Sequence, residues 1–186
     1  MNNTIFYLVG HAGVGKLTIA REIGALTGAK VIDNHYVNNP IFNLIDLYRP
    51  TGLPEEVWVQ VDAVRDAILK TIASLSPREW SFVFTHVGLD IPGDIGVYHA
   101  IRETAVKRGA RFQPVRLTCT IEEHVQRIAA PERRAMLKDV SPDNARKDSR
   151  KPLLRFDEPH ALDLDVTSLS PREAAEAIIE AAARRS

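Results

Sequence analysis

The sequence predicts an α/β fold, a three-layer αβα sandwich built around a parallel sheet of five strands. Segments rich in β-branched and aromatic residues alternate five times with segments whose apolar residues recur at helical spacing. The connections between successive strand-like segments are long enough to cross over a sheet, which parallel pairing requires. A glycine-rich loop follows the first strand-like segment, at the edge where such sheets bind ligands.

The predicted strands are short and mostly apolar, and they cover residues 4–9, 30–33, 81–85, 111–118 and 162–166. Segments of this length and composition are typical of strands buried in the middle of a sheet. The last of them alternates polar and apolar residues, which predicts a strand with one exposed face.

The predicted helices are marked by their ends. One covers 16–27 and stops at Gly28, and another covers about 95–107 and stops at Gly109. Residues 40–75 predict a helix in two pieces, broken near 50–52. Capping boxes predict helix starts at Thr120 and at Ser170, the second with Pro171 at its first position and an end near residue 184.

One hexapeptide, Ser-Leu-Ser-Pro-Arg-Glu, occurs twice, beginning at Ser74 and at Ser168. The flanking residues do not match. We therefore interpret it as turn-and-cap chemistry used twice rather than as the trace of a duplication.

Composition limits the class of protein. The chain has 186 residues, of which 45% are apolar and 26% charged, values typical of one folded domain that spans 1–186. Lys plus Arg and Asp plus Glu both number 24, so the basic excess of a general nucleic-acid binder is missing and a nucleic-acid partner is not expected.

Location is predicted from three further features. The first residues lack the positive region of a secretory signal, and no apolar run reaches the roughly 18 residues that span a membrane. Cys119 is the only cysteine, which excludes a disulfide within the chain and any zinc site built on several cysteines. We expect a cytoplasmic protein.

The strongest signal for function is the loop after the first predicted strand. It reads Gly10-His11-Ala12-Gly13-Val14-Gly15-Lys16-Leu17-Thr18. The pattern Gly-x4-Gly-Lys, between a predicted strand and a predicted helix, predicts a P-loop (Walker A motif) that cradles the phosphates of a nucleotide. Glycine lets the backbone approach the phosphates, the inward N–H groups bind them, and Lys16 adds positive charge. His11 is expected to contribute its backbone N–H.

The loop departs from the usual motif at one position. Leu17 stands where a Ser or Thr would bind Mg²⁺ directly, and the hydroxyl comes one residue later at Thr18. In this the loop resembles that of adenylate kinases. The resemblance implies that Thr18 contacts phosphate and that Mg²⁺ is held largely through water.

The rest of the chain resembles the shikimate kinase and nucleoside monophosphate kinase group in its length, its βα count and its closing strand and helix. The segment Arg150-Lys151-Pro152-Leu153-Leu154 is similar to an Arg-Pro-Leu-Leu segment of shikimate kinases, with one residue inserted. The resemblance implies a P-loop NTPase fold and the transfer of phosphate from ATP to a small molecule.

The acceptor side is expected after the second and third predicted strands. Asp33, Asn34 and His35 follow the second strand. Shikimate kinases carry Asp-x-Asp at this place for Mg²⁺ and the acceptor hydroxyl, so the resemblance makes Asp33 a candidate base and metal residue, although His35 replaces the second acid. The alternative is a turn at Asp33 and Asn34, with His35 packed on the surface.

The third predicted strand ends at Thr85 and His86, without the acid that many P-loop proteins use to hold the Mg²⁺ shell. Asp33 or Asp90 is the candidate to replace it. His86 is equally compatible with a substrate contact and with a structural role.

Basic residues gather late in the chain. Residues 127–155 contain nine basic and four acidic side chains, a net charge of +5 that leaves −5 for the remainder. In the kinase group this place holds a lid, and the resemblance implies a lid insertion at about 129–152. Arg127 would then contact the nucleotide, Arg133 and Arg134 would act in catalysis, and Arg150 would bind the acceptor. A solvated charged helix and a grip on a nucleic-acid backbone are the alternatives.

These observations predict a shikimate kinase-like, ATP-dependent phosphotransferase that uses Mg²⁺ and acts on a hydroxyl or phosphate of a small-molecule acceptor. Lys16 and the loop amides would bind the phosphates, and Asp33 would be the base. An NTP hydrolase or a nucleotide-dependent regulatory switch on the same fold is the first alternative. A binding protein without catalysis is the second, favoured by Leu17 and the missing acid.

Overall fold

The protein forms a parallel sheet of five strands in the order β2-β3-β1-β4-β5. This computed structural model describes residues 2–47, 52–128, 143, 146–147 and 149–184. The strands are β1 (Thr4–Val9), β2 (Lys30–Ile32), β3 (Phe82–His86), β4 (Arg111–Thr118) and β5 (Leu162–Asp165). The predicted fold class is therefore confirmed, and each predicted strand exists within a residue of its expected bounds.

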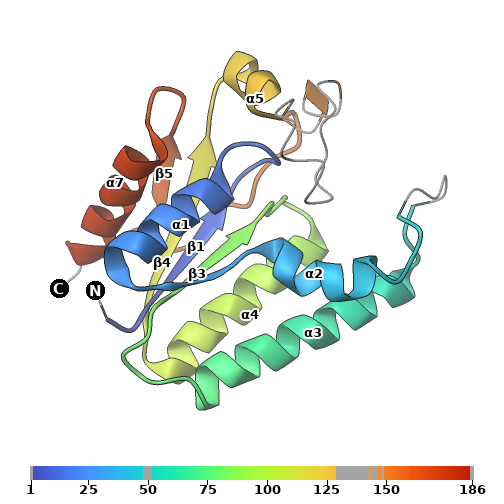
Figure 1. Cartoon of the computed structure of the whole chain (residues 1–186), viewed down its shortest axis with the longest axis horizontal. Helices are drawn as coiled ribbons and strands as arrows, with labels where there is room; N and C mark the ends of the chain where they lie inside the picture. Colours follow the sequence, from blue (N-terminus) through green and yellow to red (C-terminus); the bar gives the residue numbers. More distant parts are fainter. Residues whose placement is uncertain (1, 48–51, 129–142, 144–145, 148, 185–186) are drawn as a thin grey trace.

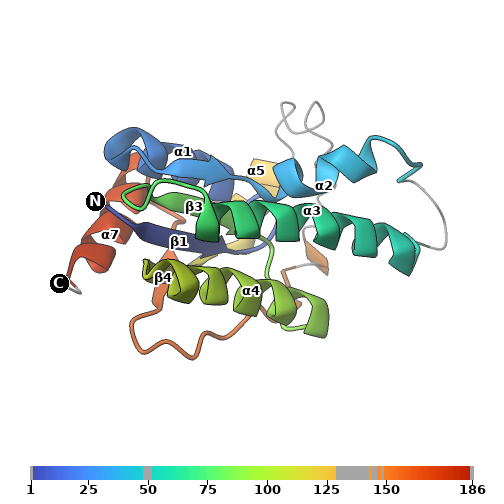
Figure 2. The ribbon, with the colours of Figure 1, turned by 90° about the horizontal axis from the view of Figure 1, so that it is seen from below.

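Helices cover both faces of the sheet and make three layers (Figure 1). The helices are α1 (Lys16–Thr27), α2 (Asn34–Phe42), α3 (Glu55–Ser74), α4 (Pro92–Arg108), α5 (Ile121–Ile128) and α7 (Pro171–Ala183). Figure 2 shows α1 and α4 on opposite sides of the sheet. Phe6 and Leu8 of β1 belong to the apolar cluster shared with α1 and α7. Ile5, Tyr7 and Val9 belong to the cluster shared with α3 and α4.

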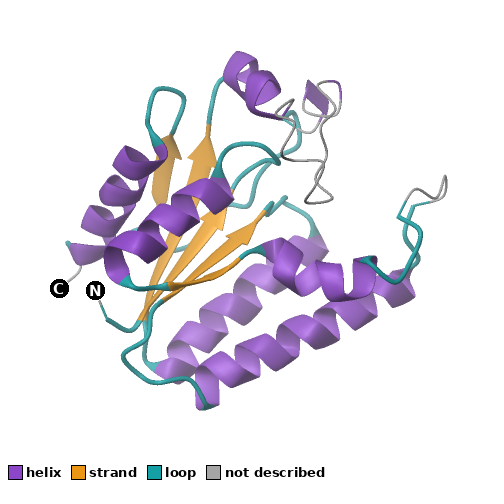
Figure 3. Ribbon diagram, viewed as in Figure 1, coloured by secondary structure: helices purple, strands orange, loops and turns teal. Residues whose placement is uncertain are grey.

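The central strand β1 explains this layering. All six of its residues are buried, because it lies between β3 and β4 and is covered on both faces. The edge strand β5 alternates between half-buried and exposed positions, as its sequence predicts. The carboxyl ends of the parallel strands lie at one edge of the sheet, where the loops gather (Figure 3).

Two predicted helix starts were wrong. Helix α2 begins at Asn34 rather than near Pro40, because the Asp33 side chain caps it by accepting a hydrogen bond from the His35 N–H at 2.8 Å. Pro40 lies inside this helix, close to its end at Phe42. Helix α4 begins at Pro92, three residues earlier than expected, with proline in the first turn where its missing N–H costs no hydrogen bond.

The loop after β3 is fastened by a segment from late in the chain. Leu89 and Leu153 form an antiparallel bridge, and the Leu154 N–H donates to the Gly88 carbonyl at 2.8 Å. Gly88 has φ +66°, and a Cβ there would lie 2.5 Å from a methyl carbon of Val9. The segment that resembles shikimate kinases thus closes one side of the loop cluster.

Two further findings concern the chain as a whole. None of the helices in the described residues is both long and apolar enough to cross a membrane. The predicted lid at about 129–152 falls mostly on residues outside the described part of the chain, as do Arg133 and Arg134.

Candidate active site

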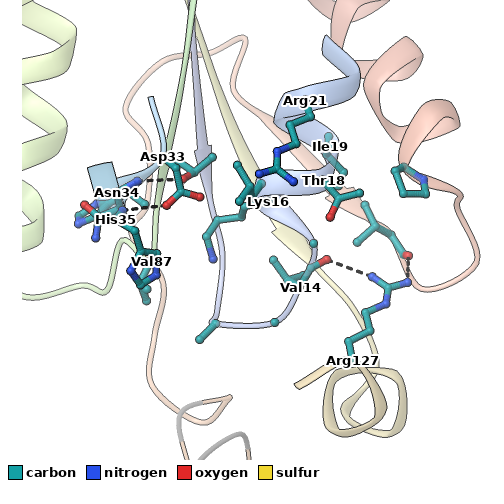
Figure 4. A pocket seen from close by; sticks show the side chains of 18 of the residues that line it. Val14, Lys16, Thr18, Ile19, Arg21, Asp33, Asn34, His35, Val87 and Arg127 are labelled. Carbon is teal, nitrogen blue, oxygen red and sulfur yellow. Dashed lines mark hydrogen bonds between the residues drawn. The ribbon is translucent and has the colours of Figure 1, made fainter. Parts of the chain in front are cut away.

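A cavity of about 470 Å³ opens at the carboxyl edge of the sheet (Figure 4). One wall is the P-loop with the start of α1, from Ala12 to Ile19, together with Arg21. The opposite wall contains residues 33–35, which follow β2, and residues 85–87 at the end of β3. Arg127 of α5 completes it, together with Val166 and Leu169 of the loop between β5 and α7 and with Pro171 at the start of α7.

The P-loop has the backbone shape that an anion site requires. Gly10, Gly13 and Gly15 have φ of +159°, +101° and +108°. At the last two the left-handed conformation favours glycine. In the described part of the chain the N–H groups of Gly13 and Gly15 donate no hydrogen bond to the protein. They are therefore available to a bound anion at the start of helix α1, and the loop fits the phosphates of a nucleotide.

The side chain of Lys16 folds back onto the P-loop. Its Nζ donates to the carbonyl oxygens of Gly10 and, at 2.9 Å, His11. Gly10 and His11 are not among the residues that line the cavity, whereas Lys16 and Thr18 are. The ammonium group is thus held by carbonyls of its own loop, and Lys16 also lines the cavity in which phosphate charge would lie.

Asp33 faces Lys16 across the cavity (Figure 4). It is 3% exposed, and its carboxylate accepts the capping hydrogen bond from His35. The Asn34 N–H donates to the Thr85 hydroxyl at 3.2 Å, which ties this corner to the end of β3. A turn at Asp33 and Asn34 was the alternative to a functional role for Asp33. The structure has a helix N-cap at this position. One carboxylate oxygen can cap the helix while the other faces the cavity.

His86 lines the same cavity, but both of its ring nitrogens are directed at neighbouring side chains. Nδ1 lies 2.8 Å from the Tyr7 hydroxyl, and Nε2 lies 3.6 Å from Oδ1 of Asp94. Burial lowers the pKa of His86 to about 3, with smaller contributions from the charges of Arg65 and Lys16. The imidazole is therefore neutral at physiological pH. Its N–H is expected on Nε2, toward Asp94, which leaves Nδ1 to accept from Tyr7.

Asp94 is an acid near the end of β3 that the sequence reasoning missed. It lies in the first turn of α4, accepts the Leu89 N–H at 2.6 Å, and faces His86. Burial raises its pKa above the ordinary value. The sequence feature that could have identified it is its place two residues after Pro92, in the first turn of a helix that follows β3. Asp90, which we considered for a metal role, is exposed and is not part of the cavity lining.

Arg65 is a second missed residue. Its side chain is only 13% exposed, and it lines a small cavity of about 10 Å³ beside the main one. The two cavities share Asn34, Thr85 and His86. Within the described residues Arg65 pairs only with Asp62, one turn earlier on α3, whose side chain is 65% exposed. Most of the guanidinium donors are thus unused by the described residues, beside the cavity wall that contains Asn34 and His86.

Arg127 lines the cavity, as expected, but its guanidinium is engaged by the protein. It donates to the Val14 carbonyl at 3.0 Å and to the Val166 carbonyl at 3.0 Å (Figure 4). It also pairs with Glu123. A direct contact with nucleotide therefore stays a prediction. Arg150 is exposed and does not line the cavity.

A divalent metal has suitable donors here. Thr18 and Asp33 both line the cavity and offer oxygen atoms, which Mg²⁺ prefers. Within the residues that the structure describes, no group of three or more His, Cys, Asp or Glu side chains is close enough to hold a metal ion. The donor set fits an ion that keeps several waters and shares the phosphates of a nucleotide.

The chain has the fold of P-loop small-molecule kinases, as its sequence predicted. Comparison with known structures supports this. A gluconokinase from Sinorhizobium meliloti 1021 superimposes with a TM-score of 0.64 at 15% identity, over 98% of this chain and 93% of that one. An APS kinase from Mycobacterium tuberculosis, determined with AMPPNP and APS, gives 0.62 at 14% identity, over 97% of both chains.

A shikimate kinase from Acinetobacter baumannii, determined with shikimate, gives a TM-score of 0.55 at 17% identity, over 97% of this chain and 93% of that one. At these identities the likeness shows the fold alone. No protein-family model matches the sequence, and no curated protein matches it.

Proposed function

We propose that this protein is an ATP-dependent phosphotransferase that acts on a small-molecule acceptor. The observation that carries the proposal is that one cavity contains both the phosphate-binding loop with Lys16 and, on its opposite wall, the buried Asp33. Phosphoryl transfer requires this juxtaposition, because the acceptor oxygen must approach in line with the phosphate that leaves the nucleotide.

The residues would divide the chemistry as follows. The N–H groups of the loop and Lys16 bind the phosphates of ATP, and Lys16 moves from the loop carbonyls to the phosphate charge. An acceptor hydroxyl gives its proton to Asp33 while its oxygen forms a bond to the γ-phosphorus. The bond from that phosphorus to the β,γ-bridging oxygen breaks, and ADP leaves. Thr18 and Asp33 would hold Mg²⁺, which supplies positive charge to the phosphates.

The acceptor that this site suits best is an anion. Arg65 places a nearly buried positive charge with unused donors beside the wall that carries Asn34 and His86. A planar guanidinium matches a carboxylate or a phosphate or sulfate ester in a bidentate pair. Its present partner Asp62 is largely exposed, so the ion pair between them is weak and an anionic acceptor can replace it.

Measuring ATP consumption with and without a panel of acceptors tests the function. The panel pairs each acid with a neutral analogue, for example gluconate with sorbitol. We expect consumption to depend on an acceptor and to favour the acid of a pair. Equal consumption without any acceptor would instead identify an NTP hydrolase.

Arg65→Met tests the acceptor assignment. We expect KM for the acid to rise about 10- to 150-fold, the effect of losing a charged hydrogen bond, with little change in KM for ATP. Arg102→Met is the matched control, because Arg102 lies on α4, pairs with Glu158 and does not line either cavity, and its side chain is 52% exposed. An unchanged acceptor KM in Arg65→Met would remove the anion from the proposal.

A further inference from the structure

Helix α5 holds the P-loop from outside through two side chains. His124 is 3% exposed, and its Nε2 contacts the carbonyl oxygen of Ala12. Because a carbonyl only accepts hydrogen bonds, this nitrogen carries the proton. Arg127, one turn later, donates from Nη1 to the carbonyl of Val14 at 3.0 Å. Two carbonyl groups of the loop are therefore held by one short helix.

The same guanidinium also holds a second loop. Nη2 of Arg127 donates to the Val166 carbonyl at 3.0 Å and to the Thr167 carbonyl at 3.4 Å, and Nε pairs with Glu123 at 2.6 Å. Val14 and Val166 both line the cavity. Arg127 therefore sets the separation of two cavity walls, the P-loop and the loop between β5 and α7.

Close packing accompanies these hydrogen bonds. A Cβ placed on Gly13 would lie 3.3 Å from the His124 ring and 3.4 Å from Ile128, which is buried. The loop and the helix are thus in direct contact, and even a methyl group on Gly13 would be tightly packed between them. The hydrogen bonds act between two surfaces in direct contact, and this packing restricts their geometry.

We propose that His124 and Arg127 are positioning residues that hold the P-loop in its phosphate-binding shape before the nucleotide arrives. When a nucleotide binds, Lys16 turns to the phosphates and releases the carbonyls of Gly10 and His11, while the contacts from α5 remain. Because the loop is already ordered before the nucleotide binds, binding does not carry the entropic cost of ordering it, and the affinity is higher. This proposal rests on the proposed nucleotide site, and it differs from a direct contact between Arg127 and the nucleotide.

Calorimetric binding of ADP and of inorganic pyrophosphate tests it, because pyrophosphate probes the loop without a base or ribose. We expect His124→Leu to weaken both ligands by about 5-fold and Arg127→Met by about 10- to 150-fold, the effects of a neutral and a charged hydrogen bond. His124→Gln and Arg127→Lys should each recover part of the loss, because each keeps a donor for the loop carbonyl.

His160→Leu is the matched control. The Nε2 atom of His160 contacts the Phe112 carbonyl at 3.2 Å, a similar histidine-to-carbonyl contact that does not line the cavity. This variant should lose stability without losing affinity for either ligand. Unchanged affinities in both His124→Leu and Arg127→Met would overturn the proposal. Weakened ADP with unchanged pyrophosphate in Arg127→Met would also overturn it, in favour of a contact with the nucleoside.

Hydrogen exchange separates this proposal from the proposed function. The Val14 N–H donates to the His11 carbonyl at 3.2 Å within the loop. In ligand-free protein we expect faster exchange of this amide in His124→Leu than in the wild type or in His160→Leu. If the wild type binds neither ligand, the nucleotide site itself is wrong. Equal exchange in all three proteins would then also reject the positioning role.

Discussion

Lys16 and Asp33 are the two residues on which the chemistry depends, and each has a structural contact that its sequence motif did not reveal. The Lys16 ammonium group contacts carbonyls of its own loop, and the Asp33 carboxylate caps helix α2. Neither contact conflicts with the proposed roles, since an ammonium group can turn to phosphate and a carboxylate has two oxygens. Variants at these positions must therefore distinguish the structural role of each side chain from its proposed role in the reaction.

Lys16→Ala is expected to abolish most ATP use while the protein stays folded. The residue supplies charge to the phosphates, and the loss of one strong electrostatic contact costs on the order of 10²–10³ in rate. Its ammonium group donates to two carbonyls of its own loop, and Lys16 belongs to neither apolar cluster of the core. Turnover and circular dichroism check the two halves of the prediction, and full activity would reject the P-loop assignment.

Asp33→Asn is expected to reduce phosphoryl transfer far more than nucleotide affinity. An amide cannot take a proton at neutral pH, but it still accepts a hydrogen bond from the His35 N–H, so the cap of α2 remains. Asp33→Ala removes both and should also cost about 1 kcal/mol of stability. Transfer rates and ADP affinity are measured on both variants. Unchanged transfer in Asp33→Asn would make Asp33 a cap residue only.

At the scale of secondary-structure elements, the repeated hexapeptide shows that one local sequence can form two structures. The hexapeptide at Ser168 forms the start of α7, where Ser170 accepts from the Glu173 N–H at 3.2 Å and the Glu173 carboxylate accepts from the Ser170 N–H at 2.9 Å. The copy at Ser74 ends α3 and enters a turn before β3.

The buried Arg108 explains the second outcome. Its guanidinium donates to the carbonyls of Ile72 at 2.6 Å and Ser76 at 3.1 Å, and also to those of Pro77 and Trp80. These carbonyl groups are held in a turn by a side chain from α4, so the local preference for a helix start does not decide the conformation.

The two copies supply a matched pair of variants at the element scale. Ser170→Ala removes an N-cap and should lower the free energy of unfolding by about 1 kcal/mol. Ser76→Ala should cost less than about 0.5 kcal/mol, because its exposed hydroxyl makes one long contact, to the Thr71 carbonyl at 3.4 Å, and Arg108 keeps its hold on the backbone. Denaturant unfolding of both variants measures the difference. Equal losses would contradict the assignment of the cap.

For the molecule as a whole, the buried side chains of Tyr7 and His86, with the half-buried Asp94 beside them, link the candidate site to the stability of the protein. Burial raises the pKa of Tyr7 well above its ordinary value and lowers that of His86 to about 3. The folded protein therefore keeps both side chains neutral over a wide range of pH. His86 lines the cavity and contacts Tyr7 of the central strand β1. The uncharged state of His86 therefore depends on burial within the sheet and not on one loop.

We therefore expect the free energy of unfolding to decrease as the pH is lowered, and part of this decrease to depend on His86. Between pH 6.5 and about 3 the unfolded chain binds a proton at this side chain and the folded protein does not. The free energy of unfolding therefore decreases as the pH drops through this range, with a slope from His86 approaching about 1.4 kcal/mol per pH unit. Urea unfolding from pH 7 to 4 should show a shallower slope in His86→Gln. His99→Gln, at an exposed position, serves as the control, and equal slopes in all three proteins would disprove the prediction.

The sequence alone determined the sheet, the P-loop and the ends of most helices. These features depend on local chemistry: apolar runs form strands, Gly28, Gly109 and Ser170 mark helix ends, and the spacing from Gly10 to Thr18 specifies a phosphate loop. Only the tertiary structure decided which side chains lie around that loop and beside the opposite wall of the cavity. Arg65, Asp94 and His124 lie in ordinary helical positions of the sequence. They reach the site only because parallel strands bring the ends of distant segments to one edge of the sheet.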